Sequence, residues 1–357
     1  MDKAADIHAP DAAIGVALPV SGLSSDEALA PRRLRKRDVA ATLAKLAVSV
    51  GAIFLVLRMV DFDTAFRRAE AQHLPLIFVG LAVMGLQLVL GAWRWHAVRR
   101  GLGIEATFGN SMRLYSIGSF FSSYVISGVS GDIMRGWLSF KGGIDPARAA
   151  NSVILDRVVV LVGIAVMMLP AMPWFFLTFG TGIEGWAPAL AAGGLFVAVI
   201  ATGQARRLPA SWQATLPGRL ARKLGDGMHD VFMRPRAALW AVSAAALAQV
   251  ALAGATWALA LSLEIPVQFL DCLIIIQIVA VVNAIPISVG GWGVREAAVV
   301  VLFGLIGVER EAALLLSVEL GLLGLVVNLP GGVVWLMSPA DQRSRKASQL
   351  APKPAPQ

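Results

Sequence analysis

Seven ionisable residues in or beside apolar stretches of this 357-residue sequence are candidates for a functional site, because a charged side chain is costly there. They are three arginines, Arg135, Arg157 and Arg295, and four carboxylates, Asp132, Asp156, Glu296 and Glu319. A guanidinium binds the oxygens of an anionic group in a bidentate manner, and a carboxylate can hold that arginine or carry a proton. The residue types therefore predict a site for an anionic group, with the arginines as ligands and the carboxylates as charge partners or proton carriers.

Structural roles are open alternatives for the adjacent pairs among these residues. In one interpretation Arg157 binds a lipid phosphate and Asp156 is its partner or a proton carrier. In the other, the two residues are a buried structural pair that braces Arg135 or Asp132. Arg295 is the stronger candidate ligand of the other pair, because adjacent residues on a helix point about 100° apart and cannot both face one ligand. Glu296 is therefore expected to pair with another helix.

Other polar residues of the apolar stretches are interpreted mainly as parts of the scaffold. Glu319 is either a coupling carboxylate or a hydrogen-bonded packing residue. Gln277 and Asn328 are expected to join helices through hydrogen bonds. Arg94 and Arg99 follow the end of an apolar stretch, so we interpret them as anchors at the membrane surface.

The composition places the chain in a membrane and excludes several classes of protein. Hydrophobic residues make up 57% of the chain and charged residues 15%, and a soluble core could not bury that much apolar surface. The single cysteine, Cys272, excludes an internal disulfide, and four scattered histidines give no spacing typical of a metal site. No phosphate-binding loop or nucleotide-binding fold is evident. We expect no metal, no cofactor and no enzymatic activity.

The hydropathy pattern predicts an all-α, polytopic membrane protein. A helix needs roughly 20 apolar residues to cross a bilayer. Six stretches meet that need, at 39–58, 74–93, 149–170, 187–204, 237–261 and 312–337. Two further apolar regions, 110–141 and 267–308, each hold a Gly-rich break and a charged or short second arm, which predicts two re-entrant hairpins. The backbone is expected to turn at Gly128, Gly131, Pro286, Gly290, Gly291 and Gly293.

The distribution of lysine and arginine predicts that both termini are cytoplasmic. With six spans and two re-entrant hairpins, 24 of the 31 basic residues fall on one side, which identifies that side as cytoplasmic. A membrane domain at 39–337 then lies between two disordered cytoplasmic tails, 1–38 and 338–357. The basic cytoplasmic loop 205–236 is expected to hold an amphipathic helix on an anionic leaflet. Topology explains the net charge of +8 without nucleic-acid binding.

The two breaks resemble each other. Residues 129–135 align with residues 289–295 at an offset of 160, and they share Val, Gly and Arg in the frame V-x-G-x-x-x-R. The charge distribution makes the first hairpin enter from the cytoplasm and the second from outside, which predicts an inverted repeat. Transporters place such breaks at the bilayer midplane, where helix N-termini and basic side chains hold an anionic substrate group. A substrate cavity between two inverted halves is therefore expected.

Three segments of the chain, 120–135, 155–157 and 285–296, carry a family resemblance. The last of them has the most specific motif, Pro-x-Ser-x-Gly-Gly-x-Gly-x-Arg-Glu. Over about residues 40–337 the chain resembles the lysylphosphatidylglycerol synthase transmembrane region family, also called flippase-like membrane proteins. The first segment departs from the family pattern, because the family usually has Pro where Ile126 stands and Gly where Ser130 stands.

The resemblance implies a lipid translocase of the bacterial inner (plasma) membrane, without the cytosolic synthase domain. Its partner would be a membrane phospholipid or modified lipid, with Arg135, Arg157 and Arg295 on the lipid phosphate. One alternative is a lipid-binding scaffold or accessory subunit for a lipid-modifying enzyme. A minor alternative is an intramembrane serine protease, because residues 128–131 have the form Gly-x-Ser-Gly. However, none of the four histidines lies in the middle of a span, where the catalytic base is needed.

Overall fold

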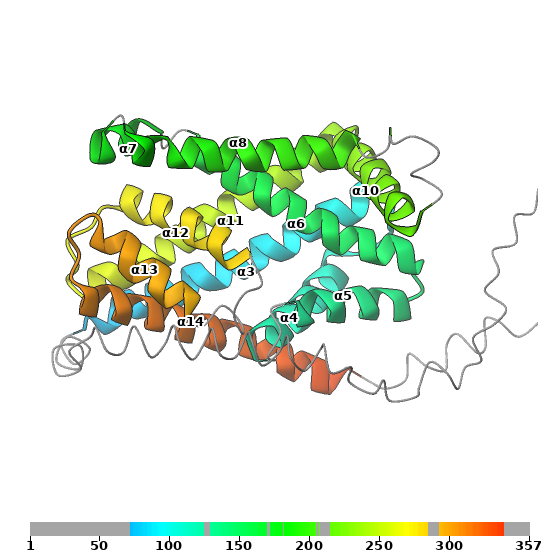
Figure 1. The fold of residues 1–357 in the computed structure, drawn as a ribbon. Coiled ribbons are helices and arrows are strands. Elements are labelled where there is room, and N and C mark those ends of the chain that lie inside the picture. Colours follow the sequence, from blue (N-terminus) through cyan, green and yellow to red (C-terminus); the bar gives the residue numbers. More distant parts are fainter. Residues whose placement is uncertain are drawn as a thin grey trace, which may run out of the picture. The chain divides into compact units, whose positions relative to one another are not determined.

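The computed structural model describes residues 72–124, 129–169, 172–180, 182–204, 207, 215–284 and 293–338. Every regular element in these ranges is a helix, which confirms the predicted all-α class for this part of the chain (Figure 1). The predicted span 39–58 and, apart from Ser338, both predicted tails lie outside the described residues. The same holds for four predicted turn residues, Gly128, Pro286, Gly290 and Gly291.

The described helices follow one another through short connections or through stretches outside the described ranges. In chain order they are α3 (Leu74–Gly101), α4 (Phe108–Tyr124), α5 (Ser130–Lys141), α6 (Pro146–Met168), α7 (Met172–Phe179), α8 (Ile183–Gln204), α10 (Leu216–Phe232), α11 (Pro235–Ser262), α12 (Phe269–Ala284), α13 (Val294–Gly304) and α14 (Arg310–Met337). Local signals set several helix starts, because α3, α6 and α11 have proline in the first turn. The Asp145 carboxylate also caps α6 by accepting a hydrogen bond from the backbone N–H of Arg148 at 3.0 Å.

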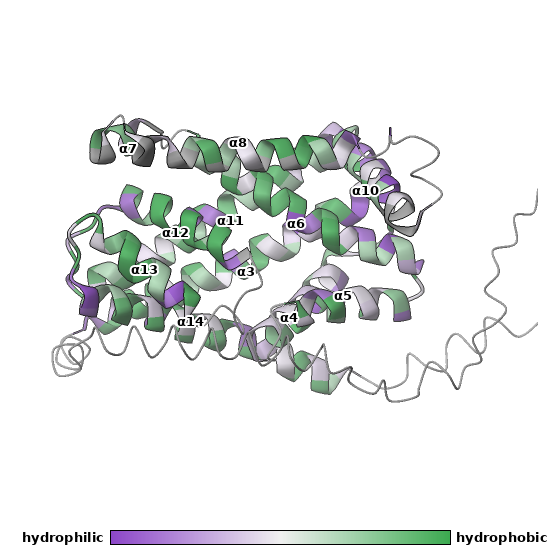
Figure 2. Cartoon of the chain, in the orientation of Figure 1, coloured by the Kyte–Doolittle hydropathy of each residue, from purple (hydrophilic) through white to green (hydrophobic). Residues whose placement is uncertain are grey.

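Four of the described helices, α3, α6, α11 and α14, are long and apolar enough to cross a membrane. They confirm four of the predicted spans, at 74–93, 149–170, 237–261 and 312–337. Large apolar side chains such as Leu86, Leu247 and Val326 are exposed on these helices, as contact with lipid requires. Figure 2 shows that hydrophobic residues recur along the helices. The helix α8 covers the predicted span 187–204 but is not one of the four. The count of six spans therefore stays a prediction.

Two series of four helices have similar lengths. The helices α3, α4, α5 and α6 contain 28, 17, 12 and 23 residues, and α11, α12, α13 and α14 contain 28, 16, 11 and 28. In each series a long helix is followed by two short helices around a break and then by a second long helix. The similarity between the two breaks therefore extends to a unit of four helices, which we call the first and second series.

The long helices that begin the two series, α3 and α11, pack against each other in opposite directions. At one end of the pair, the backbone N–H of His73 donates to the carbonyl of Ser262 at 3.4 Å. At the other end, the ring centroids of Trp93 and Trp240 lie 6.1 Å apart. These two helices occupy the same position in their series and run in opposite directions.

The helices α4 and α5 fold back on each other around the first break. Near the break, the Ser130 hydroxyl donates to the carbonyl of Phe121 at 2.7 Å. Farther from it, the guanidinium carbon of Arg135 lies 5.4 Å from the centroid of the Tyr115 ring. Across the second break, α12 and α13 also contact each other. Each break therefore joins two short helices that pack together.

Gly131 lies where α5 packs closest to α4. A Cβ atom at this position would overlap the carbonyl oxygen of Gly118 and the hydroxyl of Ser122. We therefore expect Gly131→Ala to destabilise the folded protein by about 1–3 kcal/mol, the usual cost of overpacking. Gly136→Ala on the same helix is the control, because its nearest neighbour is Val153 Cγ2 at 3.6 Å, an ordinary contact distance. Thermal unfolding in detergent measures both variants, and equal midpoints would contradict the packing argument.

The largest apolar core lies in the second series, whereas the first series contains charged groups in its interior. In the second series, Leu259 of α11, Ile275 of α12, Phe303 of α13 and Leu316 of α14 are buried in one cluster. The apolar cluster around Trp95 in the first series is smaller, and it borders the charged side chains. The interior of the first series therefore holds the charged groups that could bind a polar ligand.

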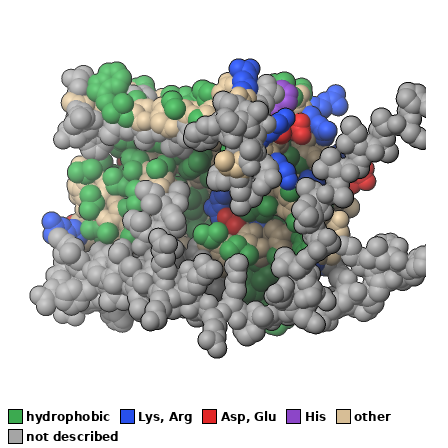
Figure 3. Space-filling model, turned by 45° about the vertical axis from the view of Figure 1, so that its right-hand side comes forward, with side chains coloured by type: hydrophobic (Ala, Val, Ile, Leu, Met, Phe, Trp, Pro, Cys, Tyr) green, Lys and Arg blue, Asp and Glu red, His purple; other side chains and the backbone are tan. Residues whose placement is uncertain are grey.

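The helix α10 packs on the other helices. Its residues Met228 and Val231 are buried in a cluster with Ala97 of α3 and Leu155 of α6. An amphipathic helix is therefore present within the predicted basic loop, but at these residues its apolar face contacts protein and not a lipid leaflet. The reason is that the ends of α3 and α6 offer an apolar surface next to it. Basic and acidic side chains gather toward the upper right of Figure 3, near the end of the molecule where Figure 1 places α10.

Candidate functional site

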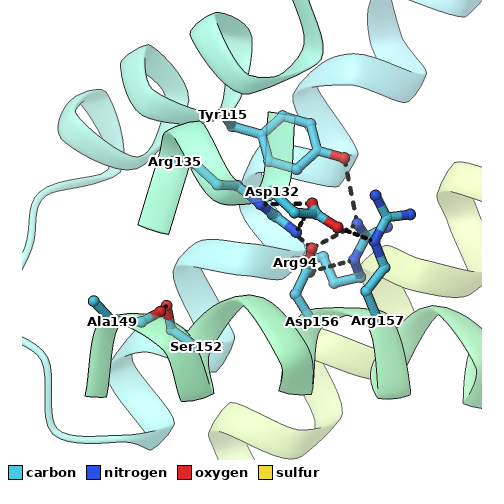
Figure 4. Close-up of polar contacts among 8 residues, drawn as sticks. All are labelled: Arg94, Tyr115, Asp132, Arg135, Ala149, Ser152, Asp156 and Arg157. Atoms are coloured by element: carbon cyan, nitrogen blue, oxygen red, sulfur yellow. Dashed lines mark hydrogen bonds and ion pairs between the residues drawn. The ribbon is translucent and has the colours of Figure 1, made fainter. Parts of the chain in front are cut away.

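Charged side chains from three helices of the first series meet inside the protein, next to a tyrosine from a fourth. This charged cluster consists of Arg94 from α3, Tyr115 from α4, Asp132 and Arg135 from α5, and Asp156 and Arg157 from α6 (Figure 4). Asp132 and Arg135 are three residues apart, so their side chains share one face of α5. Asp156 and Arg157 are adjacent on α6 and point in different directions, which lets them contact different partners.

Asp156 is the buried centre of the charged cluster. Its Oδ1 accepts a hydrogen bond from Arg94 Nε at 2.7 Å, and its Oδ2 accepts one from Arg135 Nη1 at 2.7 Å. Arg94 Nη2 also donates to Oδ2 at 3.2 Å, which makes the Arg94 contact bidentate. Only 1% of Asp156, 3% of Arg135 and 7% of Arg94 is exposed. One carboxylate therefore neutralises and orients two buried arginines.

Aromatic side chains cover these two buried arginines. Arg94 Nη2 lies 3.3 Å from the Tyr115 hydroxyl oxygen and donates to it. The guanidinium of Arg135 lies over two rings, with its Cζ 5.1 Å from the centroid of Trp95 and 5.4 Å from that of Tyr115. The negative face of an aromatic ring attracts a cation, and this attraction is stronger away from water. The aromatic residues therefore stabilise the buried part of the charged cluster.

Arg157 and Asp132 form the exposed edge of the charged cluster. Arg157 Nε donates to Asp132 Oδ2 at 2.7 Å, and Asp132 Oδ1 accepts a second hydrogen bond from Arg135 Nε at 3.1 Å. The Arg157 side chain is 56% exposed and that of Asp132 is 16% exposed. In Figure 4 the two terminal nitrogens of Arg157 point away from the carboxylates. Arg157 can therefore donate to a further acceptor while its Nε keeps the bond to Asp132.

The charged cluster has an excess of positive charge. Its three arginines face two aspartates, which leaves one formal positive charge in apolar surroundings. On the face drawn in Figure 3, basic and acidic atoms meet in a recess bordered by apolar side chains. Electrostatic attraction is stronger where water is partly excluded. The arrangement therefore favours binding of an anion at the Arg157 edge.

The second break carries a smaller charged group. Arg295 Nε donates to Glu296 Oε1 at 3.0 Å, and the backbone N–H of Gly293 donates to Glu296 Oε2 at 2.5 Å. The expectation that Glu296 pairs with another helix is wrong, because its carboxylate caps its own helix and binds the adjacent arginine. Gly293 has a φ of 86°, which suits a glycine at a turn. Gly131 was predicted to be such a turn residue but lies within α5.

The predicted site residues make three sets of contacts. Asp132, Arg135, Asp156 and Arg157 meet in the charged cluster, Arg295 pairs with Glu296, and Glu319 accepts a hydrogen bond from the side chain of Gln72. Asp156 thus braces Arg135, which is the structural alternative for that residue, whereas the adjacent Arg157 is exposed. The bond to Gln72 agrees with a packing role for Glu319.

The sequence-based interpretation of two arginines of α3 as anchors at the membrane surface is wrong. Arg94 and Arg99 do not anchor the helix at the membrane surface, because they are 7% and 1% exposed. The predicted span ends at residue 93, whereas α3 continues to Gly101, so both arginines lie inside the helix. For Arg99 the available signal was Trp95, because residues four apart share one face of a helix and an aromatic ring there can cover a buried guanidinium. Tyr115 carried no comparable signal.

The two polar residues expected to join helices behave differently. Asn328 Nδ2 donates to Ser123 Oγ at 2.8 Å, which joins α14 to α4 and confirms the prediction. Gln277 is 1% exposed, and neither of its side-chain amide atoms has a hydrogen-bond partner among the described residues. The helix-joining bond predicted for Gln277 is therefore not found.

The side chains of the described residues also limit which inorganic ions could bind to them. Within the ranges given above, no three His, Cys, Asp or Glu residues are placed to hold a metal ion. Cys272 is a buried free cysteine in α12. The donors available in the charged cluster are guanidinium and hydroxyl groups, which bind oxyanions.

Comparison with protein-family models gives a match over most of the chain. The model described as lysylphosphatidylglycerol synthase TM region matches residues 42–332. The matched range includes the first series, the charged cluster and all but the end of the second series. A search of curated proteins found no match to the chain.

Proposed function

Since the chain belongs to the lysylphosphatidylglycerol synthase transmembrane-region family, we propose that it is a lipid translocase that moves a phospholipid-type or modified lipid between leaflets. The family ties the chain to lipid handling, and the four candidate spans agree with an integral membrane protein. The observation that carries the proposal is the exposed edge of the charged cluster. There, Arg157 is held by Asp132 and can still donate to a phosphate.

The two series are proposed to form an inverted repeat around a lipid cavity. The antiparallel packing of α3 and α11 supports this arrangement, because equivalent helices of an inverted repeat cross the bilayer in opposite directions. The helix pairs α4–α5 and α12–α13 are proposed as the two re-entrant hairpins. Their lengths of 17, 12, 16 and 11 residues support this, since each is shorter than a full span. Relative movement of the two series would expose the cavity to each leaflet in turn.

The charged cluster is proposed to bind the lipid headgroup at its exposed edge and to hold its shape at its buried centre. Arg157 would donate from its terminal nitrogens to phosphate oxygens, a charge-assisted contact with bidentate geometry. Asp132 would orient Arg157, while Asp156 would hold Arg94 and Arg135 as fixed positive charges behind it. Arg135 would reach a phosphate itself only in a conformation that separates it from the two aspartates.

The second break is proposed to contribute from the opposite half. Arg295 would be its phosphate ligand, oriented by Glu296, and Glu319 would be a candidate coupling carboxylate. We further propose that the chain is not an enzyme and that it resides in a bacterial inner membrane with both termini in the cytoplasm. Its partner would be the transported lipid, alone or together with an enzyme that modifies it.

Reconstitution tests the proposal directly. The purified full-length chain is placed in liposomes that carry labelled anionic or zwitterionic phospholipids, and the labels left in the outer leaflet are reduced chemically. Lipid movement should raise the fraction of label that becomes accessible over time, above the level in protein-free liposomes. Accessibility equal to that of protein-free liposomes for every lipid would contradict translocation. Lipid that co-purifies with a chain that moves none would support the scaffold alternative.

A further inference from the structure

Arg99, near the end of α3, is a buried arginine without an acidic partner in the part of the chain that the structure describes. Its Nη1 donates to Asn110 Oδ1 at 3.1 Å and to Ser111 Oγ at 2.9 Å, and both acceptors are neutral. Arg99 is 1% exposed, so water does not solvate its charge. By contrast, each arginine of the charged cluster contacts a carboxylate. The carbonyl groups at the C-terminal end of α3 place partial negative charge near Arg99, but they do not supply a counter-ion.

Three buried hydrogen-bond donors, one of them on Arg99 itself, lack an acceptor among the described residues. The buried atoms are Trp95 Nε1, Arg99 Nε and Ser139 Oγ. The guanidinium carbon of Arg99 lies 4.8 Å from the centroid of the Trp95 ring, and that of Arg135 lies 5.1 Å from the same centroid. Ser139 is one helical turn beyond Arg135 on the buried face of α5. Gly131 packs on Gly118 and Arg135 lies over Tyr115, so the antiparallel register of α5 on α4 places Ser139 beside Ser111, which binds Arg99. The three donors therefore lie near one another, around the contact of α3 with α4.

Such a group of donors requires an acceptor. A buried donor without a partner destabilises the folded protein, and a charged one does so more strongly. An indole N–H can only donate and a guanidinium has no acceptor atom, so these two groups cannot satisfy each other. The Ser139 hydroxyl could accept, but it forms no hydrogen bond with either of them. The side of Arg99 that includes Nε is also one of the sides on which a guanidinium binds an oxyanion with two parallel hydrogen bonds. A ligand with several oxygen acceptors and a negative charge would satisfy the whole group.

We propose that Arg99, Trp95 and Ser139 form a second anion site, which takes a phosphate-type oxyanion. This site is separate from the edge of the charged cluster, where Arg157 binds Asp132. The oxyanion could be the phosphate of a membrane lipid, since Arg99 lies in the last turn of a candidate span. It could equally be inorganic phosphate. Because Arg99 is buried beneath α4, the anion enters when α4 moves away from α3.

Thermal unfolding of the full-length chain in uncharged detergent distinguishes the two sources. One arm adds inorganic phosphate against gluconate at equal ionic strength, and the other adds short-chain phosphatidic acid against short-chain phosphatidylcholine. A ligand of the folded state raises the unfolding midpoint in a saturable way, and we expect a rise of about 2–4 °C. A rise with phosphate identifies a free-anion site, and a rise with phosphatidic acid alone identifies a lipid site. No rise in either arm would overturn the proposal.

Variants test whether the rise in the unfolding midpoint comes from an anion bound at Arg99. Arg99→Gln should lose it, whereas Arg100→Gln should keep it, because Arg100 is the exposed neighbour of the same residue type. If Arg99→Gln does not fold, Ser139→Ala removes one donor without a change of charge and should weaken the apparent affinity several-fold. An equal rise in wild type, Arg99→Gln and Ser139→Ala would place the bound anion elsewhere and overturn the proposal. The test does not involve lipid movement, so its failure leaves the translocase proposal standing.

Discussion

Asp156→Asn is expected to cause the largest loss of stability of any single substitution in the charged cluster. The asparagine keeps the size of the side chain but leaves Arg94 and Arg135, which are 7% and 3% exposed, without the carboxylate that neutralises them. Removal of one partner from a buried ion pair typically costs about 3–5 kcal/mol. We therefore expect a much lower yield of monodisperse protein in detergent and a much lower unfolding midpoint.

Asp226→Asn is the matched control for this substitution. Asp226 lies on α10, where its side chain is 55% exposed and pairs with Arg222 across 3.8 Å. Exposed pairs of this kind contribute about 0–1 kcal/mol, so the midpoint should stay close to that of the wild type. An Asp156→Asn variant with the same midpoint as Asp226→Asn would show that the buried carboxylate is not required for the fold.

Arg157→Gln is expected to have the largest effect on lipid movement while the fold remains intact. Asp132 would keep its hydrogen bond from Arg135, so the buried centre of the charged cluster would not lose a partner. The lost contact is a charge-assisted hydrogen bond to phosphate, worth about 1.5–3 kcal/mol. This corresponds to a decrease of roughly 10–100-fold in the rate of movement in liposomes. The free energy of unfolding should change by less than about 1 kcal/mol, because the lost pair is partly exposed.

Two further variants make this prediction specific. Arg222→Gln removes an arginine of similar exposure, 52%, from α10 and should leave the rate of movement unchanged. Arg157→Lys keeps the charge but loses the planar fork, so it should restore only part of the rate. A rate for Arg157→Gln equal to that of Arg222→Gln would remove Arg157 from the headgroup site.

The sequence was sufficient to predict most of the scaffold that the structure describes. The spans α3, α6, α11 and α14 were found because a bilayer requires long apolar helices, and such helices are visible in the hydropathy of one segment at a time. The repeat was also visible, since residues 129–135 and 289–295 share a local frame. Its extension to four helices needed the structure, because the flanking helices share their lengths and not a motif.

The contacts inside the site could not be predicted in the same way. Asp156 binds Arg94, which precedes it by 62 residues, and only the packing of α3 on α6 brings the two together. The predicted end of the first of these helices at residue 93 also placed Arg94 outside the membrane. Glu296 shows the converse case, because its partners are the backbone of Gly293 and the adjacent Arg295. A cap of this kind depends on where the helix begins, which hydropathy does not define.

The antiparallel pair of α3 and α11 has a consequence for biogenesis. During synthesis α3 leaves the ribosome long before α11, so it enters the bilayer without the helix that covers it in the finished protein. Until α11 is synthesised, the face of α3 that α11 covers has no partner, so the packing of the first half of the chain is completed only by a helix of the second half.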